Sequence, residues 1–298
     1  MINKSIQTYL KNHKIFLDRS ILEYLNRLSA PKEIKDIMSY AVLGGGKRIR
    51  PFLLAETAKL YGVSSKVYKY PCMAVELAHC FSLVYDDLPC MDDDDLRRGK
   101  ATVHKVFNEA NALLGGASLL VYSFNLLSLD SFKINIKDKV KIISNFSQVT
   151  GAAGVLAGQY LDLLAENKNF KLTMNKFKEI QKKKTSLLIA FSTLTGAILG
   201  KANKKEQNEI YEIGLLMGSL FQIQDDILDV EGNEKEMGKK VKKDKELNKA
   251  TIIRIKDINY AKKEVKRIGF KIKNKLLAIN KNTEKLITLT DFLMQRTS

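Results

Sequence analysis

All four prolines of this 298-residue chain lie in its first third, at Pro31, Pro51, Pro71 and Pro89. A proline inside a helix removes a backbone donor and clashes with the preceding turn, so the remaining two thirds permit long uninterrupted helices. Apolar residues recur at helical spacing along the chain, and no run alternates as a half-buried strand does. We therefore predict an all-α protein with a single domain over residues 1–298. The helical runs are Phe52–Leu60, Met73–Val84, Ala112–Leu129, Ile142–Leu164, Leu187–Leu199 and Ile210–Leu228.

Three long stretches without charged residues raise the question of a membrane protein. Two of them, Ala110–Leu129 and Ile142–Leu161, are long enough to span a bilayer. The third, Thr185–Gly200, is shorter. The two long stretches contain Asn, Gln, Ser and Gly, which lipid tolerates poorly, so buried helices are expected instead. We expect no transmembrane segment.

Cysteine usage and the N-terminus favour a cytoplasmic protein. Cys72, Cys80 and Cys90 show neither a disulfide framework nor paired zinc ligands. The chain opens without the pattern of a signal peptide. Its formal charge of +17 leaves open a basic protein that binds nucleic acid or a membrane surface. However, the lysines are spread along the chain without a recognition motif, so no nucleic-acid partner is expected.

Against this basic background, two clusters of acidic residues lie about half the chain length apart. The first, Asp86–Asp95, contains six aspartates, and the second, Asp225–Asp229, contains three. Such close packing of like charge is costly unless a cation lies between the carboxylates. Mg²⁺ takes carboxylate oxygens and keeps positions for water and substrate phosphates. The two clusters therefore indicate a metal-bridged diphosphate site.

The second cluster has the geometry of one helix face. At about 100° per residue, Gln222, Asp225, Asp226 and Asp229 fall on one narrow side of a helix. A solvated acidic face is the ordinary alternative. It fits poorly, because the residues around the cluster in Ile210–Leu228 are largely apolar and predict a buried helix.

The first cluster is expected to bend. Pro89 stops or kinks the helix that Asp86 and Asp87 end. Asp92 then comes from the following loop and can return toward Asp86. An exposed acidic loop and a calcium loop are the alternatives, but the spacing lacks the EF-hand order and its final Glu.

Arginine is scarce in this lysine-rich chain, and part of it gathers near glycine and aspartate. Arg48 and Arg50 follow the Gly44–Gly46 turn, and Arg97 and Arg98 follow the first acidic cluster. The planar guanidinium suits bidentate contacts with phosphate. These positions are candidates for diphosphate binding.

Two further residues share helix faces with these groups. Lys47 and Arg50 stand at i and i+3, so their side chains lie on one side of a helix. His79 lies seven residues, or about two turns, before Asp86 on the same face. The alignment favours a role for His79 in the site, while His104 has weaker support.

Taken together, five segments resemble the trans-isoprenyl diphosphate synthase (polyprenyl synthetase) family, and most of all its bacterial farnesyl diphosphate synthase type. They are Gly45–Pro51, His79–Gly99, Gly158–Asp162, Lys184-Thr185 and Phe221–Asp229. They occur in the family's order between about residues 40 and 250. The resemblance implies a helical bundle of the isoprenoid-synthase type around a central active-site cavity, and a cytoplasmic homodimer. It also implies Mg²⁺-dependent condensation of isopentenyl diphosphate with dimethylallyl or geranyl diphosphate to farnesyl diphosphate.

The same resemblance implies a role for each matching position. Three Mg²⁺ ions per site would be held by Asp86, Asp92 and Asp225. The metal shell would be supported by Asp87, Asp226 and Asp229. The allylic diphosphate would be contacted by Arg97, Lys184 and Lys239. Isopentenyl diphosphate would be held by Lys47, Arg50, His79 and Arg98, and the developing allylic cation would face Thr185, Gln222 and the backbone around Lys184.

The most detailed expectation concerns the chain length of the product. In the family, residues just before the first aspartate motif close the pocket for the hydrocarbon tail. Phe81, five residues before Asp86, and its neighbour Ser82 occupy this place here, and an aromatic ring there resembles enzymes that stop at fifteen carbons. An ordinary core role for Phe81 is the alternative. A geranylgeranyl diphosphate synthase is the rival interpretation of the activity.

This chain also departs from the family pattern where glycine is usual. The departures are Asn108, Ser186, Lys242 and Asn248. Lost glycines restrict the backbone, so slower turnover or a differently shaped lid is expected.

Two other members of the wider fold fit less well. A terpene cyclase normally mixes Asn, Ser or Thr with Glu in its second metal motif, and a non-catalytic subunit would be expected to lose metal ligands that this chain keeps.

Overall fold

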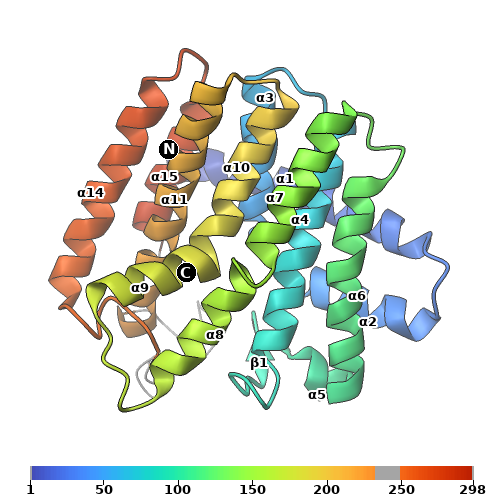
Figure 1. The fold of residues 1–298 in the computed structure, drawn as a ribbon, viewed down its shortest axis with the longest axis horizontal. Coiled ribbons are helices and arrows are strands. Elements are labelled where there is room, and N and C mark those ends of the chain that lie inside the picture. The colour runs from blue at the N-terminus through green and yellow to red at the C-terminus, as the bar shows by residue number, and fades with distance from the viewer. Residues whose placement is uncertain (1, 232–248, 297–298) are drawn as a thin grey trace.

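Helices make up nearly all regular structure in the computed structural model, which describes residues 2–231 and 249–296 (Figure 1). The first half of the chain contains α1 (Ile2–Asn26), α2 (Lys32–Leu43), α3 (Ile49–Leu60), α4 (Ser65–Asp86), α5 (Val103–Phe107), α6 (Glu109–Ser128) and α7 (Ile136–Thr150). The second half contains α8 (Val155–Glu166), α9 (Met174–Gln181), the π-helical turn η1 (Lys182–Ser186), α10 (Leu187–Leu199), α11 (Lys204–Glu231), α14 (Ile258–Leu277) and α15 (Glu284–Gln295). The predicted all-α fold is confirmed.

Local sequence explains several helix ends. Ser64, Asn108, Thr173 and Asp257 cap α4, α6, α9 and α14, since each side chain accepts a hydrogen bond from a backbone N–H of the first turn. Helix α4 ends at Asp86, three residues before Pro89, although it continues through Pro71 nearer its start. The caps and the proline thus fix the segments that carry the site.

One predicted helical run was wrong in its extent. The apolar pattern of Ile142–Leu164 predicted one helix, whereas the structure has α7 and α8 with a break at 151–154. Gly151 and Gly154 bound this break, and both have extended or irregular backbone angles there. Glycine loses the most conformational entropy in a helix, so two of them in four residues outweigh the apolar periodicity.

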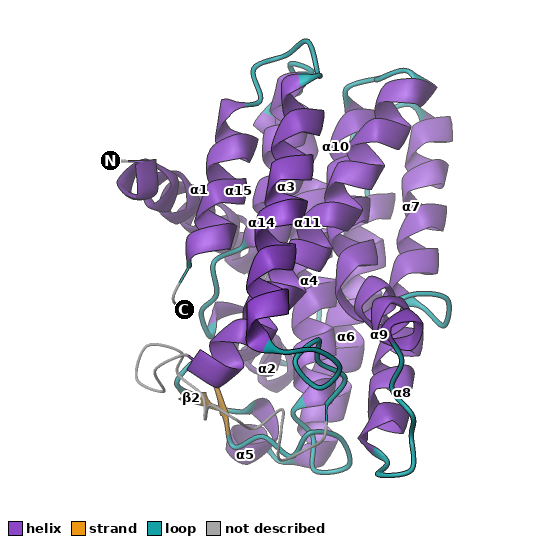
Figure 2. Ribbon diagram, turned by 90° about the vertical axis from the view of Figure 1, so that its left-hand side faces the viewer, coloured by secondary structure: helices purple, strands orange, loops and turns teal. Residues whose placement is uncertain are grey.

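The helices bury two main hydrophobic cores. One lies among α3, α4, α6, α7 and α10 and includes the rings of Phe146 and Phe191, which contact each other at an interplanar angle of 43°. The other lies among α3, α11, α14 and α15 and includes Phe52 and Leu220. Helix α3 contributes to both, and α10 packs against α3 on one side and α11 on the other (Figure 2). This packing places the ends of α4 and α11 within one bundle.

A two-stranded hairpin was not predicted. Strands β1 (Leu96–Arg97) and β2 (Lys100–Ala101) pair antiparallel after α4, and are the only strands in the part of the chain that the structure describes. Arg98 and Gly99 form its turn with φ of 55° and 77°. Two positive φ values are the mark of a tight hairpin turn, and the Arg-Gly pair is a weaker signal than Asn-Gly or Asp-Gly. The hairpin lies beside α5 at one end of the bundle (Figures 1 and 2).

Among the described helices, α6 alone is long and apolar enough to cross a membrane by length and composition. Only 39% of its most apolar window is buried inside the structure. The expectation of a buried helix is therefore met only in part by α6. Its exposed apolar side chains include Leu114 and Val121, which are 57% and 65% exposed.

Candidate functional site

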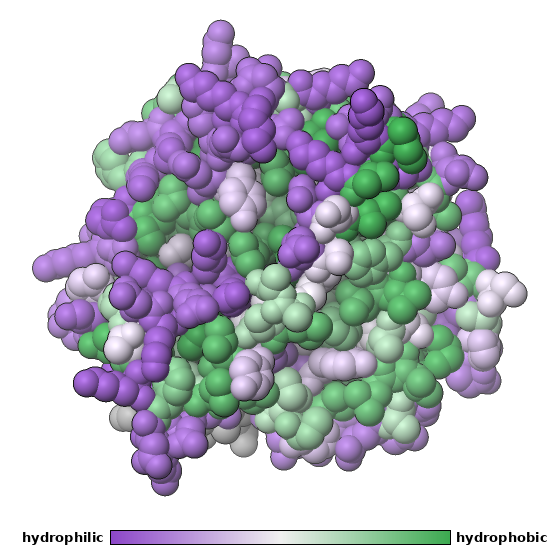
Figure 3. All heavy atoms as spheres, viewed as in Figure 1, coloured by the Kyte–Doolittle hydropathy of each residue, from purple (hydrophilic) through white to green (hydrophobic). Residues whose placement is uncertain are grey.

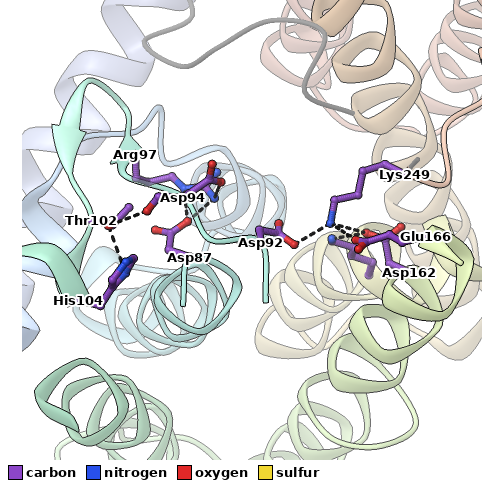
Figure 4. A network of polar contacts seen from close by, with 10 residues as sticks. Asp87, Asp92, Asp94, Arg97, Thr102, His104, Asp162, Glu166 and Lys249 are labelled. Carbon is purple, nitrogen blue, oxygen red and sulfur yellow. Dashed lines mark hydrogen bonds and ion pairs between the residues drawn. The ribbon is translucent and has the colours of Figure 1, made fainter. Parts of the chain in front are cut away.

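The first acidic cluster folds back on the end of α4. The backbone N–H of Asp92 donates to the carbonyl of Asp86 at 2.9 Å, and that of Asp94 donates to the carbonyl of Asp87 at 3.2 Å. The predicted return of Asp92 to Asp86 is confirmed. The Asp92 side chain nevertheless points away from Asp87, across to Lys249 (Figure 4).

Arg97 is anchored inside this loop. Its guanidinium donates to the buried carboxylate of Asp87, with Nε–Oδ1 at 2.8 Å, and reaches Asp94 at 3.2 Å. The nearby Thr102 hydroxyl donates to the carbonyl of Asp94 at 2.8 Å. Asp87 therefore acts in this arrangement as the anchor of Arg97. Asp86, adjacent in the chain, is half-buried, and desolvation of its carboxyl raises its pKa to about 6.

Three positions to which sequence reasoning gave no role, Asp162, Glu166 and Lys249, lie on the acidic side of the site. Lys249 Nζ lies 2.6 Å from Asp92 Oδ1 and 2.6 Å from Glu166 Oε1, and 4.0 Å from Asp162 (Figure 4). Lys184 Nζ pairs with Asp162 Oδ2 at 2.6 Å. Asp162 and Glu166 stand at i and i+4 on α8, and this shared face was the available signal.

The second acidic cluster is confirmed as part of one helix, α11, but its members differ in role. Asp226 is 1% exposed; it accepts from Gln222 Nε2 at 3.0 Å and from the backbone N–H of Ile252 at 2.8 Å. Gln222 in turn accepts from the hydroxyl of Thr185 at 2.8 Å. A hydrogen-bond chain therefore links η1, α11 and the segment that leads to α14. Asp229 is also buried.

Asp225 is the most exposed of the three aspartates, with 37% of its side chain accessible. The guanidinium of Arg296, just beyond α15, pairs with it and lies 4.2 Å from the ring centroid of Phe221. The carbonyl of Arg296 also accepts from Gln224 at 3.2 Å. Arg296 is a further position that sequence reasoning missed, because nothing local to residue 296 points to residue 225.

The basic side of the site centres on Arg50 and His79. Arg50 Nη1 lies 3.1 Å from His79 Nε2. Burial and the neighbouring Arg50 and Arg98 hold the pKa of His79 well below its ordinary value, so its ring is neutral and Nε2 accepts from the guanidinium. Arg98 reaches this group from the hairpin and donates to the carbonyl of Gly45 at 2.6 Å. Lys47 precedes α3, so the prediction that it shares a helix face with Arg50 was wrong. Its side chain is exposed, with Nζ 5.6 Å from the ring centroid of Phe292.

Glycine is required where Arg98 crosses the turn before α3. A Cβ at Gly46 would lie 2.5 Å from the guanidinium carbon of Arg98, and Gly46 has φ of +102°. Arg48, two residues later, is buried, and its ion pairs stabilise the turn that contains Gly46. Its guanidinium contacts Asp18 at 2.8 Å and Glu76 at 2.6 Å.

The donors of the two acidic clusters suit Mg²⁺ by their chemistry, since all are carboxylate oxygens. Within residues 2–231 and 249–296, however, no three His, Cys, Asp or Glu side chains are close enough together to hold a metal ion. Asp92, Asp87 and Asp225 are paired with Lys249, Arg97 and Arg296 instead. In this arrangement, basic side chains occupy the positions beside these carboxylates.

The remaining predicted positions are placed as follows. Phe81 is buried on α4, with its ring centroid 4.6 Å from that of Tyr85. Ser82, next to it, donates to the carbonyl of His79 in its own helix at 2.9 Å. Lys239, Lys242 and Asn248 lie outside the described residues.

The two remaining glycine departures have different consequences. Ser186 has φ of −73° and ψ of −34°, an ordinary helical conformation that needs no glycine. Asn108 has φ of 71° and ψ of 168°, a region that is essentially restricted to glycine. The expected backbone restriction is thus present at Asn108 and absent at Ser186.

The chain is similar to known proteins over most of its length. The family model for polyprenyl synthetase matches residues 31–288. A farnesyl diphosphate synthase from Geobacillus stearothermophilus is 39% identical over 84% of both chains. A geranylgeranyl pyrophosphate synthase from Arabidopsis thaliana is 35% identical over 90% of this chain and 72% of its own.

Solved structures are similar over almost the whole chain. A farnesyl/geranylfarnesyl diphosphate (FPP/GFPP) synthase from Zymomonas mobilis has a TM-score of 0.88 at 29% identity and covers 99% of this chain and all of its own. A geranyltransferase from Helicobacter pylori, complexed with magnesium and isoprenyl diphosphate, has a TM-score of 0.79 at 27% identity, with coverage of 97% and 96%.

Proposed function

Because the chain belongs to the polyprenyl synthetase family and is a prenyltransferase, we propose that it condenses isopentenyl diphosphate with dimethylallyl or geranyl diphosphate to give farnesyl diphosphate. In this reaction the allylic carbon–oxygen bond breaks, the double bond of isopentenyl diphosphate attacks the cation, and a proton is lost. The observation that carries the proposal is that one helical bundle holds both acidic clusters, each paired with a basic side chain, and the Arg50–His79 pair. Each part matches one requirement of the reaction.

The acidic clusters would serve the allylic diphosphate. We infer that Asp86, Asp92 and Asp225 hold Mg²⁺, three ions per site, and that bound Mg²⁺ supplies charge stabilisation for the departing diphosphate. Lys184 and Arg97 would add cationic contacts to the same group. Lys239 belongs to this proposal from its sequence motif alone. Support comes from the carboxylate chemistry of the clusters and from the magnesium-bound Helicobacter relative.

The basic group would hold isopentenyl diphosphate. Arg50 and Arg98 can offer forked guanidinium donors to phosphate oxygens. His79 is neutral, so it adds no charge; its remaining ring N–H can donate to phosphate while Nε2 keeps Arg50 in place. Lys47, exposed at the rim, can add a point charge.

The segment between the two diphosphate groups would face the developing cation. Thr185 donates its hydroxyl proton to Gln222, so the oxygen lone pairs of Thr185 remain available toward positive charge. The backbone carbonyls around Lys184 carry the same sign of partial charge. Apolar helices around this segment exclude water, which would otherwise capture the cation.

The length of the product would be set by side chains in the last turns of α4, just before Asp86. We propose that Phe81, supported by Tyr85 and next to Ser82, closes the tail pocket at fifteen carbons. The similarity to a geranylgeranyl pyrophosphate synthase supports geranylgeranyl diphosphate as the alternative product. If the alternative holds, the main product with geranyl diphosphate as primer carries twenty carbons.

The apolar surface of α6 and its neighbours supports a homodimer. Leu114 and Val121 on α6, Val140 on α7 and Tyr160 on α8 are 57% to 65% exposed. Hydrophobic atoms gather over the lower right of the molecule, where α6 and α8 lie (Figures 1 and 3). We propose that a second copy covers this surface. A cytoplasmic location is inferred with it, since all three cysteines are free thiols.

The direct test is incubation with isopentenyl diphosphate, either primer and Mg²⁺, followed by chromatographic sizing of the dephosphorylated products. We expect a fifteen-carbon alcohol, and loss of turnover with excess EDTA that Mg²⁺ restores. Asp86→Ala and Asp225→Ala should each reduce kcat by at least about 100-fold, since each removes electrostatic stabilisation of the departing charge. No prenyl product with either primer would refute the function. Full activity of both variants would refute only the metal assignment.

A further inference from the structure

The π-helical turn η1 lies between two helices that come unusually close to it. A Cβ at Gly158 of α8 would lie 2.5 Å from the Cα of Lys184 and closer still to its backbone nitrogen. On the other side, a Cβ at Gly218 of α11 would lie 2.7 Å from the Cβ of Ser186 and closer still to its Cα. Distances this short leave no room for a methyl group on either helix. Two glycines therefore flank one turn from opposite sides.

The register of this turn is also fixed by side chains. Gln181, the residue before η1, donates through Nε2 to the carbonyl of Ser219 at 3.2 Å. The hydroxyl of Ser219 donates back to Gln181 Oε1 at 3.0 Å. Ser219 follows Gly218 directly. The same point of α11 therefore leaves space for η1, at Gly218, and hydrogen-bonds the residue before η1, through Ser219.

The consequence concerns two neighbouring side chains of the proposed site. From η1, Lys184 reaches back to Asp162 on α8 at 2.6 Å, and Thr185 reaches Gln222 on α11 at 2.8 Å. Each flanking glycine lies one turn from the partner on its own helix, at i and i+4 in both cases. A shift of the turn away from either helix would lengthen one of these contacts.

We propose that Gly158 and Gly218 are positioning residues, which together admit the π-helical turn and set the places of Lys184 and Thr185 between the two acidic clusters. The inference rests on the proposed function for its kinetic consequence, but its structural part is independent of that function. It concerns the allylic half of the site only. The Arg50–His79 pair lies on α3 and α4, away from the two glycines.

A merely structural role is the competing explanation, since any glycine in a helix contact resists enlargement. Gly214 supplies the matched control. It lies one turn before Gly218 on the same helix, and a Cβ there would lie 2.5 Å from the Cα of Ala190 on α10. The steric load is similar, but this part of α10 carries none of the proposed site residues.

The experiment compares Gly158→Ala, Gly218→Ala and Gly214→Ala in the full chain, with urea unfolding, steady-state kinetics and lysine acetylation read by mass spectrometry. All three should lose stability. Gly158→Ala and Gly218→Ala should also lower kcat by about 100-fold, the effect of a displacement near 1 Å, with KM for isopentenyl diphosphate within about twofold. Gly214→Ala should keep kcat within about threefold.

Acetylation keeps the test independent of turnover. Lys184 is ion-paired with Asp162 and only 27% exposed, so the ion pair should make it react slowly in the wild type and several-fold faster in Gly158→Ala, relative to its neighbour Lys183. In Gly214→Ala the ratio should be unchanged. An unchanged ratio in Gly158→Ala overturns the proposal, as does a fall in kcat that follows the folded fraction equally in all three variants. An inactive wild type would refute the proposed function, and the acetylation ratio alone would then decide whether the glycines position Lys184.

A second variant guards against simple misfolding. Ser186→Gly in the Gly218→Ala background removes the Cβ and hydroxyl that lie 2.7 Å and 2.8 Å from the added methyl group. It should recover part of kcat, about threefold or more, because one clash is relieved. The same change should not rescue Gly158→Ala, whose clash is with the backbone of Lys184. Equal rescue of both, or of neither, contradicts the arrangement.

Discussion

Replacing Asn108 by glycine should stabilise this protein. Asn108 caps α6 through a hydrogen bond from the N–H of Asn111 at 3.0 Å, yet its backbone has φ of 71° and ψ of 168°. Asparagine is tolerated in the left-handed helical region, but this ψ lies far outside it. A non-glycine residue held there costs about 1–3 kcal/mol.

Two smaller terms oppose the gain. Glycine in place of an asparagine cap loses only a few tenths of a kcal/mol, because glycine is itself an acceptable N-cap. The added freedom of the unfolded chain costs about 0.5–1 kcal/mol. The net stabilisation for Asn108→Gly is therefore about 1 kcal/mol. For a chain of 298 residues, with about 2.1 cal/mol/K of unfolding entropy per residue, this raises Tm by about 2 °C.

The assay is urea unfolding followed by circular dichroism, with Asn108→Ala as the matched variant. Alanine keeps the unfavourable backbone and loses the cap, so it should be less stable than the wild type by about 1 kcal/mol. The expected order of midpoints is glycine, asparagine, alanine, at equal m-values. A glycine variant no more stable than the wild type would show that the cap outweighs the backbone strain and would refute the reasoning.

Three further predictions concern charge and surface. Arg48→Met leaves the buried carboxylate of Glu76 without its partner and should cost about 3–5 kcal/mol in urea unfolding, whereas Arg19→Met, which breaks an exposed pair, should cost under about 1 kcal/mol. Burial and the nearby Lys59 lower the pKa of His13 from 6.5 to about 4, so between these pH values the unfolded chain binds a proton that the folded chain does not. The free energy of unfolding should therefore fall by about 1.4 kcal/mol for each pH unit from pH 6.5 toward pH 4. His13→Gln should flatten this fall in urea midpoints measured from about pH 4 to 8. Val121→Asp should turn the proposed dimer into a monomer by light scattering, and an unchanged mass would exclude α6 from the interface.

The sequence predicted the local parts of the site well. Pro89 predicted that α4 ends at the first aspartates, and the return of Asp92 to Asp86 followed from that stop. The 100° rule placed Gln222 and Asp226 on one side of α11, where they are joined by a hydrogen bond. These features depend on residues within a turn or two of each other, and chain geometry alone constrains them.

Other local features escaped prediction because a stronger pattern concealed them. Apolar periodicity ran through Gly151 and Gly154 and hid the break between α7 and α8. The Arg98-Gly99 turn was not recognised as a hairpin, although both residues have positive φ. The exposed apolar face of α6 looked like core, since composition cannot distinguish a side chain covered by its own chain from one left uncovered.

The helical class, the end of α4 and the face of α11 that carries the aspartates all follow from residues that are near one another in the chain. The charge that each aspartate meets follows from the packing of distant helices. Lys249 lies 157 positions from Asp92, and Arg296 lies 71 positions from Asp225. No periodicity links residues so far apart; their meeting depends on how whole helices pack. The fit of η1 between Gly158 and Gly218 has the same cause, because a missing methyl group has meaning only once a neighbouring backbone occupies its place.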